Sequence, residues 1–188
     1  HYDTTIDTPG ALDNGGGVAI LLALAQELSQ RELQHGLEWI AFSGHEYLPL
    51  GDDEYLRRCG DQLEEIVVVI NFDGAGQYLG ANSIATFASS PAFEDKMTEL
   101  TRHYPGVVWV DPWPQSNHST FAWRGVPAIA LSSEGRVKWD HLRDDSVEWV
   151  SPAKLEEVAS LVTAVVEGLQ DKTLDWTRES EKEQLTHV

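Results

Sequence analysis

The chain has 188 residues, which fits one domain of ordinary size. Its formal net charge of −18 leaves no basic patch for nucleic-acid phosphates or an anionic membrane. The longest apolar run, residues 18–25, is shorter than the roughly 20 residues of a membrane helix. A single cysteine, Cys59, excludes an intrachain disulfide and a thiolate metal site. We therefore expect a soluble acidic protein, either cytoplasmic or secreted, whose oligomeric state is open.

The first half of the chain reads as loop, helix and strand in alternation. A loop rich in Gly, Asp and Asn at 8–17 leads into a helix at 18–28, which is apolar nearly all round and therefore of the buried type. A short apolar strand is predicted at 37–42 and a helix at 50–58. The clearest strand is IVVVINF at 66–72, whose β-branched residues are typical of a strand covered on both faces.

The alternation continues beyond this strand. A strand is predicted at 82–88, followed by a helix at 91–103 that has Pro in its first turn. A short strand at 107–110, a short helix at 119–123 and a strand at 127–131 complete the region.

The last long helix is predicted from Ser151-Pro152 to about residue 169, with Ser as the capping residue and Pro at the first helical position. The charged tail 171–188 is weakly periodic, so it is predicted to be an extension or a frayed end. We find no internal repeat or linker and expect one domain over 1–170. Its fold class is α/β, with a mixed, mainly parallel sheet between two helical layers.

Candidate ligand residues gather in five loop-like segments: HYD at 1–3, GALDNGGG at 10–17, FSGHEY at 42–47, NFDG at 71–74 and WDHLRDD at 139–145. Asp73 and Glu46 follow predicted strands, where open α/β sheets bind ligands. Imidazole and carboxylate groups suit zinc, manganese or cobalt. A pair of divalent ions needs a bridging carboxylate plus terminal ligands, which two His and three carboxylates can supply. Each segment alone has an ordinary explanation, such as a turn Asp or a surface His, but the ordered set of five favours a metal site.

This ordered set resembles the zinc-dependent aminopeptidases, a family that includes bacterial leucyl aminopeptidases, glutamate carboxypeptidase and, as a cyclising branch, glutaminyl cyclases. The similarity runs from residue 1 to about 170 and is closest at HYD, GALDNGGG and NFD. It implies a three-layer α/β/α sandwich and hydrolysis of a peptide or small amide. In that reaction N-terminal residues are released by water that the metal ions activate.

The resemblance also implies roles for individual residues. Asp13 would bridge two zinc ions, His1 and Asp73 would complete one ion, and Glu46 and His141 would complete the other. Asp3 would hold the ring of His1. The Asp13–Asn14 peptide bond is expected to be cis. Four aromatic residues could line the substrate site: Trp113, His118, Phe121 and Trp139.

Three features depart from the family pattern. The family's Glu-Glu pair reads His45-Glu46 here, so the catalytic base would be His45, or one of three carboxylates at 52–54, or peptidase activity would be weak or lost. The Ser-Asp-His of the family reads Ser116-Asn117-His118. The family also places strands before HxD. If they are absent, apolar edges would be exposed and one zinc ion or none would bind.

Two alternatives to an aminopeptidase stay open on the sequence alone. The first is a catalytically degenerate member of the same fold that acts as a binding domain, and His45 is the feature that favours it. The second is a glutaminyl cyclase-like acyltransferase with a single zinc, which the missing Glu disfavours. A plain nucleotide-binding domain is excluded because the Gly-rich run 15–17 lacks both the Rossmann spacing and the Walker Lys.

Overall fold

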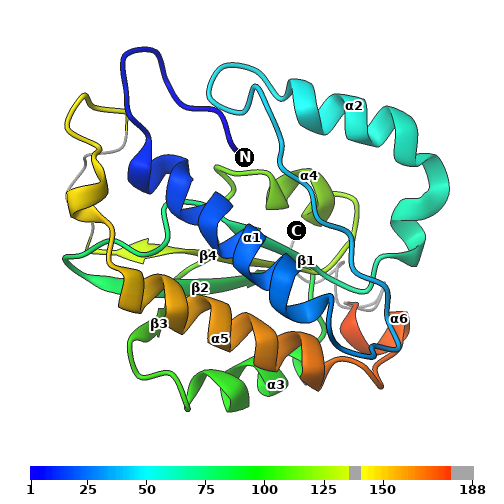
Figure 1. Ribbon diagram of the computed structural model, residues 1–188. Coiled ribbons are helices and arrows are strands. Elements are labelled where there is room, and N and C mark those ends of the chain that lie inside the picture. Colours follow the sequence, from blue (N-terminus) through cyan, green and yellow to red (C-terminus); the bar gives the residue numbers. More distant parts are fainter. Residues whose placement is uncertain (136–140, 179–188) are drawn as a thin grey trace.

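The computed structural model describes residues 1–135 and 141–178. Its centre is a mixed four-stranded sheet in the order β1-β4-β2-β3 (Figure 1). The strands are β1 (Val69–Phe72), β2 (Ala81–Phe87), β3 (Val107–Trp109) and β4 (Ala128–Glu134). β1 is parallel to β4 and β3 is parallel to β2, whereas β2 and β4 are antiparallel. The predicted α/β class with a mixed, mainly parallel sheet is confirmed.

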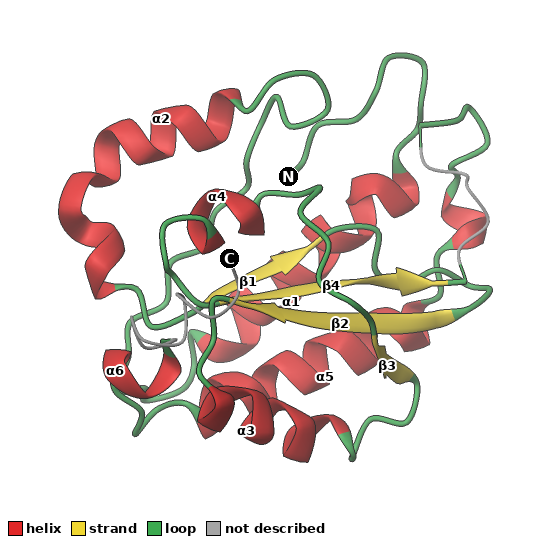
Figure 2. Ribbon diagram, turned by 180° about the vertical axis from the view of Figure 1, so that it is seen from behind, coloured by secondary structure: helices red, strands yellow, loops and turns green. Residues whose placement is uncertain are grey.

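Helices cover both faces of this sheet, as Figure 2 shows from behind. One face carries α1 (Gly16–Leu28), α3 (Pro91–Thr101) and α5 (Pro152–Gly168), whose apolar side chains join one core cluster. The other face carries α4 (His118–Ala122), with α2 (Leu50–Cys59) outside it. The three-layer arrangement follows from β1, in which Phe72 faces the first cluster and Val69 faces the second, because successive strand residues point to opposite faces.

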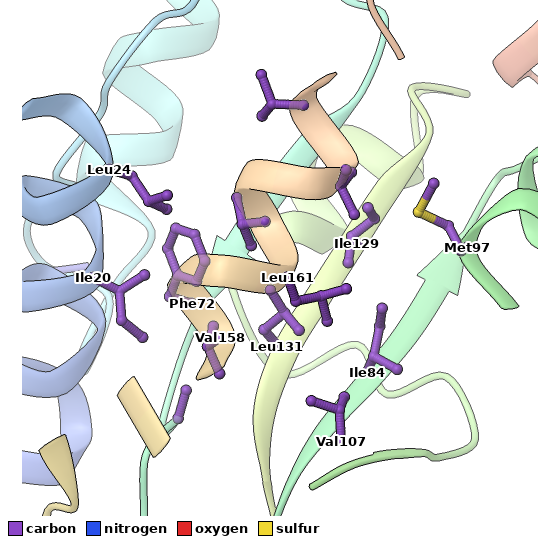
Figure 3. Close-up of a cluster of buried hydrophobic side chains, with 14 of the residues drawn as sticks. Ile20, Leu24, Phe72, Ile84, Met97, Val107, Ile129, Leu131, Val158 and Leu161 are labelled. Atoms are coloured by element: carbon purple, nitrogen blue, oxygen red, sulfur yellow. The ribbon is translucent and has the colours of Figure 1, made fainter. Parts of the chain in front are cut away.

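The larger core lies under α1 and α5 (Figure 3). Along α5, Val158, Leu161 and Val165 are buried at spacings of three and four residues, the period of a helix with one apolar face. They pack with Ile20 and Phe72 in the same cluster. Each such side chain stabilises the fold by about 1.5–3 kcal/mol through burial. This packing holds the start of α1, and therefore the loop before it, against the end of β1.

Two helix starts show different local chemistry. Ser90 caps α3, because its hydroxyl accepts the Phe93 N–H at 3.1 Å. Ser151 makes no side-chain cap at α5. Its backbone N–H donates to Gly76 O at 2.8 Å instead, which ties the helix start to the loop after β1.

The segment 37–42 differs from its prediction, since it runs extended without joining the sheet. Its side chains still alternate as in a strand, with Leu37 against the larger core cluster and Ile40 and Phe42 against the smaller one. A cleft of about 540 Å³ separates this segment from β1. The strand pattern is present, but β1 is an edge strand whose hydrogen-bonded neighbour in the sheet is β4.

The described part of the charged tail is ordered. Leu174–Thr177 forms the short helix α6, and Trp176 packs edge-on against Phe93 with ring centroids 6.3 Å apart. The Arg178 guanidinium donates to four backbone carbonyls, among them Gly125 O at 2.7 Å. Among the described residues, no helix is both long and apolar enough to cross a bilayer.

Candidate metal centre

Asp13 lies at the centre of a cluster of imidazoles and carboxylates. It belongs to an irregular π-helical turn, Ala11–Gly15, that leads directly into α1. The Asp13–Asn14 peptide bond is cis, as the family resemblance implies. One carboxylate oxygen lies 3.3 Å from His1 Nε2, and the other lies 3.3 Å from His141 Nε2. Asp13 therefore faces an imidazole on each side, as a bridging ligand must.

On the first side, His1 is held in one orientation. Its Nδ1–H donates to the backbone carbonyl of Asp3 at 3.0 Å, so Nε2 points toward Asp13 and toward Asp73, which lies 3.5 Å away. Burial disfavours the charged ring, but the Asp13 and Asp73 carboxylates outweigh it and raise the pKa of His1 to about 10. Burial likewise opposes the charge of Asp73, and the nearby His1 ring and Ser116 hydroxyl lower its pKa nonetheless. The two carboxylates therefore make this half of the cluster a favourable place for a cation.

The second side consists of Glu46 and His141, whose Oε2 and Nε2 atoms are 3.0 Å apart. The two side chains differ in setting, since the Glu46 side chain is 3% exposed and the His141 side chain 57%. Burial and the Asp13 carboxylate raise the pKa of Glu46. The Glu46 N–H donates to Asp3 Oδ2 at 3.2 Å. Asp3 thus contacts both sides, through its carbonyl to His1 and through its carboxylate to the Glu46 backbone.

The donor atoms of this cluster are the ones that a divalent cation needs. Four of the eight buried side-chain atoms that make no hydrogen bond within the described residues belong to this cluster: His1 Nε2, Asp3 Oδ1, Asp13 Oδ1 and Glu46 Oε1. Buried polar atoms are normally paired, and a coordinated metal is one of the partners that removes the cost. Nitrogen and carboxylate oxygen are suitable donors for zinc. The residues present therefore fit the metal centre predicted from the sequence.

Two further residues hold the ligand loop, and sequence reasoning missed both. Asp145, fully buried, accepts the backbone N–H groups of Leu12 at 2.7 Å and Asp13 at 3.0 Å. The Asn14 amide donates to Phe72 O at 2.7 Å and to His1 O at 3.2 Å. Asp145 is the last residue of WDHLRDD and Asn14 follows the bridging Asp, so their positions beside ligand residues were the available signal.

His45, the residue at the family's base position, lies against the first side. Its ring stacks on the ring of His1, with centroids 4.4 Å apart and planes at 29°. The carboxylates that could replace it have other roles. Asp52 is buried and accepts hydrogen bonds from Asn117 and Thr120, and Glu54 pairs with two arginines that lower its pKa to about 2. Their geometry favours helix packing over base catalysis.

The predicted substrate residues lie at different depths. His118 is fully buried, with Nε2–H donating to Trp113 O at 2.7 Å and Nδ1 3.4 Å from the Asn71 amide. Burial lowers the pKa of His118. Trp113 is partly exposed and packs edge-on against His118 at 4.8 Å. Phe121 is a core residue, 2% exposed. Trp139 lies outside the described residues.

The fold and this site together define an α/β protein with a candidate centre for two metal ions. Residues 1–166 match Peptidase family M28, and the chain belongs to that family. Over 178 residues it is 26% identical to aminopeptidase YwaD of Bacillus subtilis (strain 168), covering 88% of the chain and 39% of the relative. Over 183 residues it is 29% identical to a probable leucine aminopeptidase of Arthroderma benhamiae, covering 89% of the chain and 50% of the relative.

Solved structures show the same fold. A zinc aminopeptidase from Bacillus subtilis superimposes with a TM-score of 0.80 at 23% identity, over 96% of this chain and 48% of that one. The chain thus spans half or less of the length of these relatives. The family and fold predictions are confirmed.

Proposed function

We propose that the protein is a metal-dependent aminopeptidase that holds two divalent ions and hydrolyses the first peptide bond of a peptide or small amide. The observation that carries the proposal is the convergence of four distant residues around Asp13, with buried donor atoms left unpaired. The similarity to proteins named aminopeptidases supports the same reaction. Zinc is the metal named for a structural relative, and it suits these donors.

Each residue has a defined task in this proposal. Bound ions would supply Lewis acidity to polarise the scissile carbonyl and to activate water. Asp13 would hold both ions, His1 and Asp73 would complete one of them, and Glu46 and His141 would complete the other. Asp3 fixes the tautomer of His1 by accepting from Nδ1, so that Nε2 carries the lone pair a metal needs.

The surface around the ligands favours an apolar substrate. Tyr2 follows the ligand His1, Tyr47 follows Glu46 and Leu142 follows His141, and all three side chains are exposed. Exposed apolar groups beside a polar site favour burial of an apolar partner. We propose that they contact the first side chain of the substrate. Trp113 and His118 would support that surface from beneath, and Trp139 remains a proposed contact.

The decisive experiment combines metal analysis with turnover in the full-length protein. We expect about two zinc ions per chain and hydrolysis of leucyl-p-nitroanilide, lost on chelation and restored by zinc. An N-acetylated substrate should not be cleaved, because an aminopeptidase needs the free amine. Turnover that survives complete metal removal, or a lack of turnover with both ions bound, would contradict the proposal.

A second candidate is a degenerate family member that binds metal and ligands without turnover. The observation that favours it is His45 itself, an imidazole where the family has a carboxylate. Zinc binding without hydrolysis of any aminoacyl-p-nitroanilide would support it. Hydrolysis that appears only in His45→Glu would identify the native protein as this degenerate form.

A further inference from the structure

His45 is positioned to do something other than accept a proton. It lies in the loop between the extended segment 37–42 and α2, next to the ligand Glu46. Its ring is half-buried and stacks on His1, with the centroids 4.4 Å apart. A base for water attack needs an open approach to the substrate side, whereas His45 packs on a metal ligand.

The donor atoms around His1 form two groups with metal-ligand spacing. One group is His1, Asp13 and Glu46, in which the ligand roles are already proposed. The other is His1, His45 and Asp73, whose donor atoms all lie within 4.8 Å of one another. His1 is 8% exposed, and its Nε2 atom is unpartnered among the described residues. A buried, unpaired imidazole nitrogen thus lies within reach of an imidazole not yet given a role.

We propose that His45 is a direct ligand of the ion held by His1 and Asp73. Asp13 would contribute the fourth donor to that ion and would also bind the second ion. This inference rests on the metal centre of the proposed function and adds one residue to its ligands. It replaces the reading in which His45 is the catalytic base.

The distances allow this arrangement after a small movement. Zinc binds imidazole nitrogen at about 2.0–2.1 Å, so two donors of a tetrahedral ion lie roughly 3.3 Å apart. The His45, His1 and Asp73 donors fall within 4.8 Å before any ion draws them together. Side-chain rotations that move the donor atoms closer by up to about 1.5 Å close the difference, and the loop position of His45 permits them.

The proposal makes the two ions chemically unequal. The first ion would have four protein donors, two nitrogens and two oxygens, which completes a tetrahedron and leaves no open position. The second ion would have Asp13, Glu46 and His141, three donors with one position open, the pattern of catalytic zinc. Substrate and water would then bind on the exposed side, next to His141.

Zinc X-ray absorption and competitive zinc titration of the full-length protein test the proposal directly. We expect three imidazoles shared by two ions in the wild type, and two in His45→Ala. We also expect His45→Ala to weaken one of the two sites by at least about 100-fold, since loss of even an outer partner of a ligand costs 10–100-fold. His103→Ala, which removes an exposed imidazole beyond α3, is the matched control and should change neither quantity.

A second variant keeps the test valid if His45→Ala fails to fold. Cysteine is a good zinc ligand, so His45→Cys should retain two tight sites and add a Zn–S distance of about 2.3 Å to the absorption spectrum. No base-catalysis role predicts sulfur bound to the metal. A spectrum of His45→Cys without sulfur, at full zinc occupancy, would overturn the proposal.

The remaining outcomes separate this inference from the proposed function. His45→Ala that binds both ions within about threefold of wild-type affinity but loses hydrolysis would identify His45 as the base and overturn the inference. If zinc binding depends on His45 but the protein hydrolyses no substrate, the inference stands and the aminopeptidase proposal is refuted.

Discussion

On one side of Asp13, His1 and Asp73 are buried, and His1 is tied to the backbone of Asp3. On the other side, Glu46 is buried, but the His141 side chain is 57% exposed and its backbone has a left-handed φ of 64°. The first side is held by packing and hydrogen bonds, so it is preorganised. The second side depends on a short loop. Its ligands would therefore take up a fixed arrangement only when an ion binds. A site built this way should fill in two steps, the buried side first.

The largest effect is expected where the two sides meet. Asp13→Ala removes a donor from both ions, so we expect zinc content to fall toward zero and kcat/KM to fall at least about 1,000-fold, or roughly 4 kcal/mol. Metal analysis and hydrolysis of leucyl-p-nitroanilide measure the two losses. Asp7→Asn, an exposed carboxylate of the same loop region that pairs with Arg143, is the control and should retain both. Two tight zinc sites in Asp13→Ala would refute the bridging role.

Removing a ligand from the buried side tests its preorganisation. Asp73→Asn keeps the shape of the side chain but removes the negative charge that faces His1 at 3.5 Å. We expect the tighter zinc site to weaken at least about 100-fold, with hydrolysis falling in parallel. Competitive zinc titration provides the measurement. If only the weaker site changed, the proposed order of filling would be reversed.

Removing His141 tests the exposed side. Because this imidazole is largely in water, His141→Ala should leave the fold and the tighter ion in place and lower the stoichiometry from two zinc ions to one. We expect hydrolysis to fall about 100-fold or more if the exposed ion has the open position. Thermal unfolding within about 2 °C of wild type would show that the loss is local, whereas retention of both ions would argue against His141 as a ligand.

A smaller effect is expected from Asp145, which holds the ligand loop through two hydrogen bonds. In Asp145→Asn one acceptor oxygen replaces two, which leaves either the Leu12 or the Asp13 N–H unpaired. We expect a loss of about 1–3 kcal/mol in the free energy of unfolding and a 10–100-fold loss in zinc affinity. Denaturant unfolding of the metal-free protein measures the loss of stability separately from the loss of zinc affinity. Asp144→Asn, the exposed neighbour, is the control.

The smallest effect concerns pH and depends on His118, behind the buried side. Burial lowers the pKa of His118, which sits behind Asp73 through Asn71 and Ser116. Below the unfolded-state pKa of about 6.5, the unfolded chain binds a proton that the folded chain does not. Stability should therefore be complete above that pH and decline as pH falls toward the folded-state pKa. His118→Gln should remove this part of the acid limb in denaturant unfolding of metal-free protein, and an unchanged limb would contradict it.

The sequence predicted the class of fold and the cluster because both depend on local patterns. The helix period of α5 gives that element almost to the residue, whereas the β-branched run at 66–72 gives the end of β1 but places its start three residues too early. The five candidate ligands follow a family order that sequence alone displays. Their approach to one another, with 3.0–3.5 Å between the paired ligand atoms, required the structure.

What the sequence could not give are the contacts that depend on distant partners. Asp145 reaches the loop before α1 across 132 residues of chain, and no spacing rule connects them. Segment 37–42 has the composition and alternation of a strand, yet strand formation needs a hydrogen-bonded neighbour and not composition alone. The stacking of His45 on His1 likewise arises from loop geometry.

The cleft beside β1 has a practical consequence for work on these 188 residues. An edge strand presents a row of backbone donors and acceptors that can template pairing with another molecule. Here the row lies among apolar side chains such as Val69 and Ile70, which are only partly buried. Association of the protein through this edge would therefore appear as a sedimentation coefficient that rises with protein concentration.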